Sequence, residues 1–201
     1  TAMDSFLKSL FGDQYPQRFG GGTYVLVDRN NVLYAPYGET LYGLTLIDPK
    51  RPGKGIAPRY RLDDVIQTIQ GGPAPTGTNL TGLSMTYDGH LVLTFSNGVG
   101  VIDRNLDPNS KVFYPLGKGE QVTNSIAVDN HGGIYIASNL LMHKLVWTGS
   151  ALSDKASDGA WTSPYQNSGD EQPPIIKLNN GTGSTPTLMG FGKKDDKLVV
   201  I

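Results

Sequence analysis

Pairs of short apolar runs, each pair joined by a polar turn, recur along this 201-residue chain. The clearest copies are "TYVLVDRNNVLYAPY" (23–37), "TGLSMTYDGHLVLTFS" (81–96) and "NSIAVDNHGGIYIAS" (124–138). Apolar runs of this length around turns rich in Asp, Asn and Gly predict β-hairpins. Segment 186–201 has the same pattern, with its turn at 193–197, and is the fourth copy.

The first three hairpins continue into another apolar stretch, at 41–48, 98–105 and 141–147. Each predicted turn contains an aspartate: Asp28, Asp88, Asp129 and Asp195 or Asp196. Successive turn aspartates are 60, 41 and about 66 residues apart. A basic period of about 40 residues with insertions is the signature of one four-stranded blade per repeat. The sequence therefore predicts an all-β fold, a β-propeller with about four blade repeats in this chain. An open β-sandwich is the alternative, but strands that are apolar on both faces favour stacked blades.

Three segments depart from the repeat. Residues 1–22 are predicted to hold a short N-terminal helix, since apolar residues recur there at helical spacing, and the blades are assigned to 23–201. Stretches 50–80 and 148–174 interrupt the period and are predicted to be long loop insertions, the first with a possible short helix at Leu62–Ile69.

The last apolar run, "KLVVI", ends at Ile201 with no turn behind it. An unpaired apolar edge strand is an aggregation liability. We therefore expect the chain to be the N-terminal part of a longer propeller, completed after Ile201 by further residues or by a second chain.

Composition excludes several classes of function. The chain has no cysteine, so disulfides and thiolate chemistry are ruled out. With 17 basic against 18 acidic residues it lacks the charge balance of a nucleic-acid binder. No apolar run approaches the roughly 20 residues of a membrane span, so no transmembrane segment is expected. A periplasmic or secreted location is compatible with this composition.

The segment from Asn124 to Ala137 resembles the blade motif of the gluconolactonase, senescence-marker-protein and paraoxonase superfamily. That motif reads roughly Asn-Gly-Ile-Ala-x-Asp-x-x-Gly-x-aliphatic-Tyr-aliphatic-Ala, and residues 80–95 look like a looser copy. The resemblance implies that Asn124 points into a central channel and binds Ca²⁺ through its amide oxygen. The chain departs from the family in two places. The "GGGTYVLVD" stretch lacks the family's first-blade Glu, and the second Asn position falls near Thr81 or Thr185.

Two functions follow as expectations. One is a lactonase- or esterase-type hydrolase with Ca²⁺ in the axial channel as Lewis acid and Asn124 among its ligands. The alternative is a non-catalytic propeller that binds a small molecule or a protein through the loops around Trp161 and Tyr165. Convergence of several oxygen ligands on Asn124 would favour the first.

No catalytic residue can be assigned, because neither a Gly-x-Ser-x-Gly nor a His-Glu-x-x-His motif is present. His90 and His131 are predicted in or beside turns, and His143 on an outer strand as a packing or surface residue.

Overall fold

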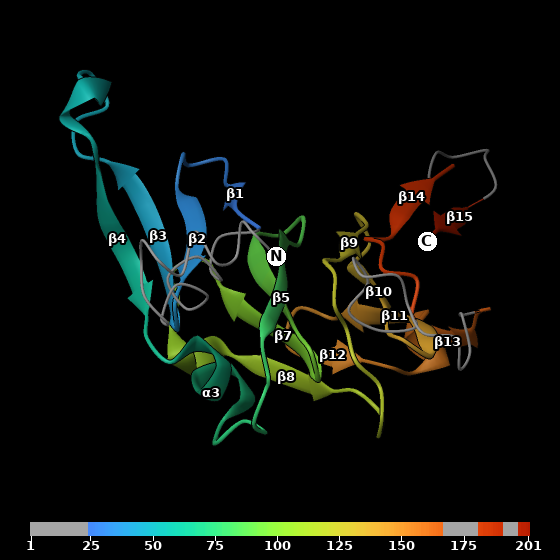
Figure 1. Cartoon of the computed structure of the whole chain (residues 1–201). Helices are drawn as coiled ribbons and strands as arrows, with labels where there is room; N and C mark the ends of the chain where they lie inside the picture. The colour runs from blue at the N-terminus through green and yellow to red at the C-terminus, as the bar shows by residue number, and fades with distance from the viewer. Residues whose placement is uncertain (1–23, 167–180, 191–196) are drawn as a thin grey trace, which may run out of the picture. The chain divides into compact units, whose positions relative to one another are not determined.

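The computed structural model describes residues 24–166, 181–190 and 197–201 (Figure 1). The helix predicted within 1–22 lies outside these ranges. The chain divides into two compact units, one reaching to Val65 and the other beginning at Ile66. Both units are built from antiparallel sheets, so the predicted all-β class is confirmed.

The first unit is a four-stranded sheet in the order β1-β2-β3-β4. Its strands are β1 (Leu26–Val27), β2 (Leu33–Tyr37), β3 (Thr40–Leu46) and β4 (Ile56–Leu62). Strand β4 lies in the stretch 50–80, which the sequence assigned to a loop insertion. The stretch contributes the fourth strand instead, and the prediction missed it because β4 is an outer strand on which only Leu62 is buried.

The second unit opens with a similar sheet in the order β5-β6-β7-β8. Its strands are β5 (Leu80–Met85), β6 (His90–Phe95), β7 (Gly98–Asp103) and β8 (Val112–Pro115). Helix α3 (Val65–Gln70) precedes this sheet, so the short helix predicted at 62–69 exists but begins three residues later. Two 3-10 turns, η1 (Pro52–Lys54) and η2 (Pro108–Ser110), lie in the connections between third and fourth strands.

The next sheet has the order β9-β10-β11-β12, and β13 also pairs with β11. Its strands are β9 (Ala127–Val128), β10 (Gly133–Ala137), β11 (Leu141–Trp147), β12 (Leu152–Ser153) and β13 (Trp161–Pro164). The predicted insertion 148–174 is thus structured over its described part: β12, the 3-10 turn η3 (Ala156–Asp158) and β13. Strands β14 (Thr187–Met189) and β15 (Leu198–Val200) pair antiparallel, as predicted for the strands of the fourth hairpin. The turn predicted between them, at 193–197, lies outside the described residues except for Lys197.

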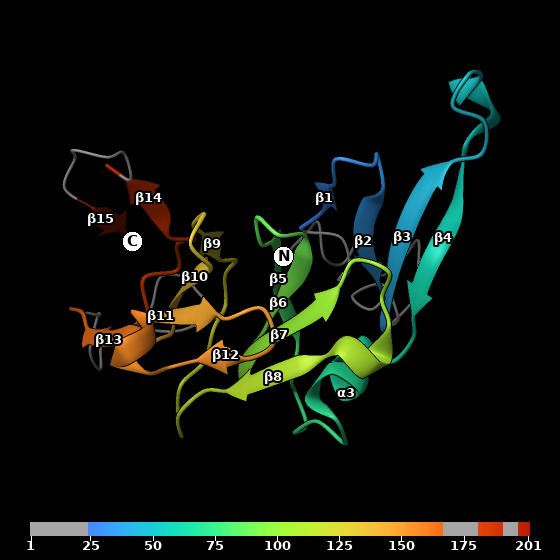
Figure 2. The same ribbon diagram turned by 180° about the vertical axis from the view of Figure 1, so that it is seen from behind.

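The sheets of the second unit pack face to face through apolar side chains. One buried cluster joins Val92, Val99 and Val101 of the β5–β8 sheet to Ile134, Leu145 and other residues of the β9–β13 sheet. On the far side of the β9–β13 sheet, a second cluster places Tyr135 and Met142 near Leu188 and Val199 of the β14–β15 pair. Figure 2 shows β8 and β12 side by side at the junction of the β5–β8 and β9–β13 sheets. The β9–β13 sheet is therefore covered on both faces.

Three hairpin turns share one backbone pattern. The amides of Asp28, Thr86 and Asp129 each donate to the carbonyl four residues further on, at 3.0, 2.8 and 2.9 Å. In each turn the side-chain oxygen of this first residue also accepts the amide of the fifth residue, at 2.9, 2.9 and 2.8 Å. Thr86 therefore takes the place that the sequence pattern gave to Asp88, because any side-chain acceptor at the first position can close this turn.

The turn aspartates have a second oxygen, which faces a tyrosine six residues on. Asp129 Oδ2 accepts the Tyr135 hydroxyl at 2.8 Å, and Asp28 Oδ2 lies 3.5 Å from the Tyr34 hydroxyl. Burial opposes the ionisation of Asp129, but these hydrogen bonds outweigh it and hold the pKa of its carboxyl below the ordinary value. At the matching position after Thr86 the chain has the buried Val92.

The β5 strand approaches the segment before β9 very closely at Gly82. A Cβ on Gly82 would lie 2.6 Å from the Ser125 Cα and 2.5 Å from the Thr94 hydroxyl oxygen, so no larger residue fits without a shift of backbone. The ladder between β5 and β6 is irregular between Leu80 and Gly82, which leaves Thr81 in a β-bulge. The Thr81 and Thr94 hydroxyls are buried without a hydrogen-bond partner.

Within the described ranges, no helix combines the length and apolar character needed to cross a bilayer.

Candidate functional site

Asn124, the predicted calcium ligand, lies just before β9 and reaches the segment that leads into β14. Its amide nitrogen donates to the Gly183 carbonyl. In this contact the Asn124 side chain joins two consecutive sheets of the second unit.

The residues at the family's other ligand positions offer hydroxyls in place of amides. Thr81 is in the β5 bulge with its hydroxyl buried, and Thr185 is exposed before β14. Calcium takes six to eight oxygen ligands, usually with several carboxylates among them. In the part of the chain that the structure describes, no cluster of three or more His, Cys, Asp or Glu side chains could hold a metal ion. These donors do not fit the ligand set that the resemblance implies, and the calcium site stays a prediction.

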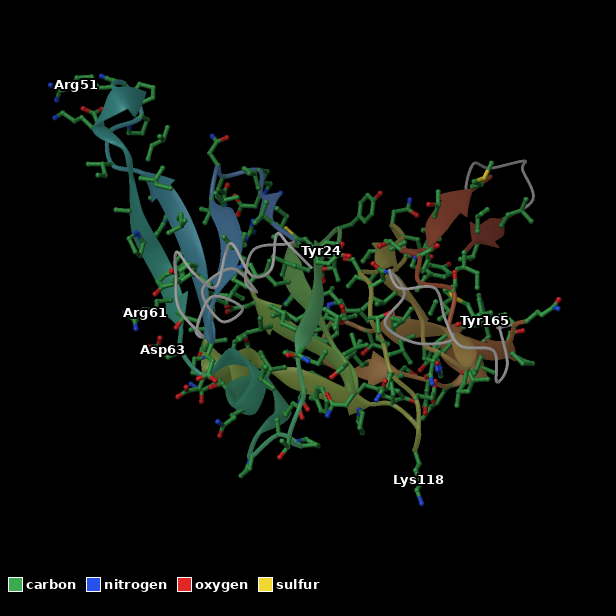
Figure 3. All side chains as sticks on the ribbon, in the orientation of Figure 1. Tyr24, Arg51, Arg61, Asp63, Lys118 and Tyr165 are labelled. Atoms are coloured by element: carbon green, nitrogen blue, oxygen red, sulfur yellow. The ribbon has the colours of Figure 1, made fainter. Side chains whose placement is uncertain are left out.

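Trp161 and Tyr165, the predicted ligand-binding aromatics, lie on and just after β13. Trp161 is 38% exposed, and its ring meets that of Tyr135 edge to face with centroids 6.2 Å apart. Tyr165, labelled in Figure 3 beside β11 and β13, donates its hydroxyl to the Ser138 carbonyl and accepts the Thr182 amide at 3.1 Å. Burial raises the pKa of Tyr165, and the Thr182 contact partly offsets the effect. The two aromatics thus differ: Tyr165 joins segments of the protein, whereas Trp161 is partly open to solvent.

A largely buried polar cluster centres on His143, which is 5% exposed. Its Nε2 lies 2.6 Å from Glu120 Oε2, and its Nδ1 lies 3.2 Å from the Thr162 hydroxyl. The Ser138 hydroxyl donates to the same Glu120 oxygen at 2.6 Å. Four side chains from the loop before β9, the β10–β11 hairpin and β13 therefore meet at one point. Of the two predicted roles of His143, packing or surface, its burial agrees with packing. The predicted outer-strand position is wrong, because β11 lies between β10 and the outer strands β12 and β13, and the carboxylate partner was not foreseen.

The protonation pattern of this cluster follows from Glu120. Burial opposes ionisation of Glu120, but hydrogen bonds from Ser138 and His143 outweigh it and keep the pKa of the carboxyl below its ordinary value. An ionised carboxylate only accepts hydrogen bonds, so Nε2 of His143 is the donor. In the neutral imidazole, Nδ1 then accepts from the Thr162 hydroxyl.

The order Thr162–His143–Glu120 is that of a nucleophile, a base and an orienting acid. The hydroxyl is on an outer strand, however, and is directed at a nearly buried ring. Ser138, the other hydroxyl, also accepts the amides of Leu140 and Leu141 at 3.2 and 2.9 Å and so closes the β10–β11 turn. The cluster therefore fixes β13 and the loop before β9 onto the hairpin.

Further polar contacts join the β5–β8 sheet to the β9–β13 sheet. The indole nitrogen of Trp147 donates to Asp88 Oδ2 at 3.1 Å, and the Trp147 ring lies 5.0 Å from that of His90. At the outer strands, the Tyr114 hydroxyl donates to Asp154 at 3.2 Å. His131 is exposed in its turn, as predicted. Asn124, Trp147 and Tyr114 therefore make contacts between sheets, whereas His131 does not.

No protein-family profile matches the sequence. An uncharacterized protein of Archaeoglobus fulgidus is 33% identical over 131 residues, which make up 63% of this chain and 23% of that protein. The chain thus spans less than a quarter of this archaeal relative.

A solved structure with some likeness is the extracellular domain of a B. thetaiotaomicron protein described as a one-component system. It is 13% identical, with a TM-score of 0.38, over 72% of this chain and 19% of that one. A score this low carries no inference about the fold.

Proposed function

We propose that the sheets of this chain are consecutive blades of a β-propeller that extends beyond it. Each of the first three sheets runs as an antiparallel meander of the type that propeller blades use. Within the second unit, apolar residues fill the space between successive sheets. The length of the archaeal relative supports further blades in the same protein.

The outward face of the β14–β15 pair carries this proposal. Leu188 and Val199 pack against the β9–β13 sheet, whereas the alternate residues Met189, Leu198 and Val200 are 52%, 55% and 47% exposed. Apolar side chains on both faces are what a blade between two neighbours requires. We infer that the next blade covers this face.

Cysteine labelling can test the cover, because the chain has no cysteine of its own. In the 201-residue chain, Val200→Cys is expected to react readily with a maleimide. In the full-length protein the same residue is expected to be protected, while Tyr87→Cys, at a turn position that is 75% exposed, reacts equally in both. Equal labelling of Val200→Cys in the two proteins would refute a covering blade.

We propose that this propeller is a non-catalytic binding module. The observation that supports it is that the candidate polar side chains make contacts within the protein, between sheets or inside a hairpin. Asn124 binds the Gly183 carbonyl, Tyr165 bridges two segments, and Ser138 closes a turn. These contacts stabilise the stack of sheets, so that loops and outer strands, Trp161 among them, are left for a ligand or partner. A periplasmic or secreted location, as predicted, is compatible with this role.

Metal and activity measurements separate this proposal from the predicted hydrolase. The binding module predicts the same melting temperature with calcium and with a chelator, and no hydrolysis of aliphatic lactones or phenyl esters. A calcium-dependent rise in melting temperature that Asn124→Ala abolishes would favour the hydrolase. Hydrolysis that is lost in Thr162→Val would instead assign the Thr162–His143–Glu120 chain to catalysis.

A further inference from the structure

The hairpin of β3 and β4 extends beyond the strand that supports it. Strand β2 pairs with β3 only as far as Leu44, so residues 45–59, here called the β3–β4 arm, continue past the end of β2 (Figure 1). Arg51 marks the tip of the arm in Figure 3. The arm is a two-stranded ribbon that ends in the 3-10 turn η1.

The arm concentrates positive charge. It holds Lys50, Arg51, Lys54 and Arg59 against a single acid, Asp48, which gives a net charge of +3. The rest of the chain has 13 basic and 17 acidic residues, a net charge of −4. The arm is therefore a basic projection on an acidic chain.

Exposed isoleucines accompany these charges. Ile47 is 58% exposed and Ile56 is 55% exposed at the end of the ladder. Charged residues and Pro58 on an outer strand are explained by protection of the edge against aggregation. That explanation does not extend to exposed isoleucines, which work against protection, or to the lysines of the turn, which lie beyond the ladder.

Hydrogen bonds hold the tip in one shape. Asp48 accepts the Lys50 amide at 3.0 Å and Arg51 Nε at 2.7 Å, and its carboxylate lies 3.9 Å from Lys54 Nζ. Gly55, at φ +92°, closes the turn and lets its carbonyl accept the Ile47 amide at 3.1 Å. The tip thus presents its cations and isoleucines without the cost of ordering a flexible loop.

We propose that the β3–β4 arm binds the surface of an anionic lipid bilayer. Basic residues gain from the negative surface potential of such a membrane, and aliphatic side chains beside them gain from burial at the headgroup boundary. The arm is shorter than the roughly 20–30 residues that each side of a standard protein interface uses. A narrow tip of this kind fits a bilayer surface better than a folded partner. This inference does not depend on the number of blades.

Vesicle sedimentation with the 201-residue chain tests the proposal. Binding is expected to phosphatidylcholine vesicles that contain phosphatidylserine, to fall steeply as salt is added, and to be weak with phosphatidylcholine alone. Each charge near such a surface changes the partition constant about fivefold. The double variant Lys50→Glu, Lys54→Glu is therefore expected to bind at least about 25-fold more weakly.

Lys118→Glu, Lys155→Glu is the matched control, with the same change in charge at exposed lysines outside the arm. Figure 3 shows Lys118 directed away from the protein. This control is expected to bind within a few-fold of the parent chain, and Ile47→Ser is expected to weaken binding even in low salt. Circular dichroism and melting temperature verify that each variant is folded.

Equal weakening by the two double variants would reduce the effect to net charge and overturn the assignment. If the chain binds neither kind of vesicle but binds poly-glutamate or single-stranded RNA through Lys50 and Lys54, its partner is a different anion. This result would also overturn the proposal of membrane binding.

Discussion

The turn aspartates of the β1–β2 and β9–β10 hairpins bond within their own hairpin, whereas the aspartate of the β5–β6 turn also bonds the neighbouring sheet. In the first two, an aspartate bonds the returning amide and faces a tyrosine of the same hairpin. In the β5–β6 turn, Thr86 bonds the amide, and Asp88 accepts the Trp147 indole of the next sheet. The backbone of the repeat is thus constant, while its polar side chains can serve either the hairpin or the junction between sheets.

The largest effect is expected where the turn is self-contained. Asp129→Ala removes the acceptor of two backbone amides and of the Tyr135 hydroxyl, and should lower the free energy of unfolding by about 3 kcal/mol. Thr86→Ala should cost about 1 kcal/mol. Urea denaturation of both variants measures the difference, and similar losses would mean that the two turns are equivalent.

Gly43 in the β1–β4 sheet and Gly82 in the β5–β8 sheet test how much a packed neighbouring sheet restricts a strand. The Cβ of Gly82→Ala would press on the Ser125 backbone, whereas that of Gly43→Ala would meet the Tyr60 side chain at 2.9 Å. Because backbone yields less than a side chain, Gly82→Ala should cost about 2–3 kcal/mol and Gly43→Ala about 1 kcal/mol. Thermal melts monitored by circular dichroism can rank them. The reverse ranking would show that β5 is free to move away from the neighbouring sheet.

At acid pH, Asp129 should contribute less to the free energy of unfolding. The folded-state pKa of Asp129 is below the unfolded value of about 3.9, so its contribution is present above that pH and is lost as the pH falls through the folded pKa. Asp129→Asn should therefore cost about 2 kcal/mol at pH 7 and less at pH 3. Urea titrations at both pH values measure this gap.

Thr94→Val serves as the matched control for the acid effect. It replaces a buried hydroxyl that has no partner, and its effect on stability should be the same at both pH values. A gap for Asp129→Asn that stays constant with pH would contradict a lowered pKa in the folded state.

The smallest expected effect isolates the bond between sheets. A double-mutant cycle of Asp88→Asn and Trp147→Phe should give a coupling energy of about 1 kcal/mol, as expected for a single bond to a carboxylate. The same cycle with Asp88→Asn and the distant Tyr165→Phe should give no coupling. A coupling near zero for the first pair would mean that the apolar cluster alone joins the two sheets.

The hairpins could be predicted because their signals are local. Asp, Asn and Gly between short apolar runs specify a turn whatever surrounds it, and the first three predicted hairpins are present. Of the fourth, the two paired strands are described. The outer strands β4 and β13 were missed because their side chains are mostly exposed, which removes the apolar alternation on which a strand prediction depends.

The contacts of the candidate site residues were harder to predict from the sequence than the hairpins. Asp88-Gly89 is the stronger turn signal, yet Thr86 closes the turn, since hydrogen bonding to the backbone needs only an oxygen at the right position. Glu120 and His143 are 23 residues apart and belong to no motif, so only the fold brings them together. The role of Asn124 was inferred from a resemblance, and its contact with Gly183 depends on a segment 59 residues away.

Two strands pair with the outer edge of β11, one after the other along its length. Val146 and Trp147 pair with β12, and Leu141 to Lys144 pair with β13. Either partner alone would complete a four-stranded sheet. Evolution can therefore lengthen or shorten the chain between them without disturbing the inner three strands. An edge with two partners thus allows the length of the segment that follows β11 to vary.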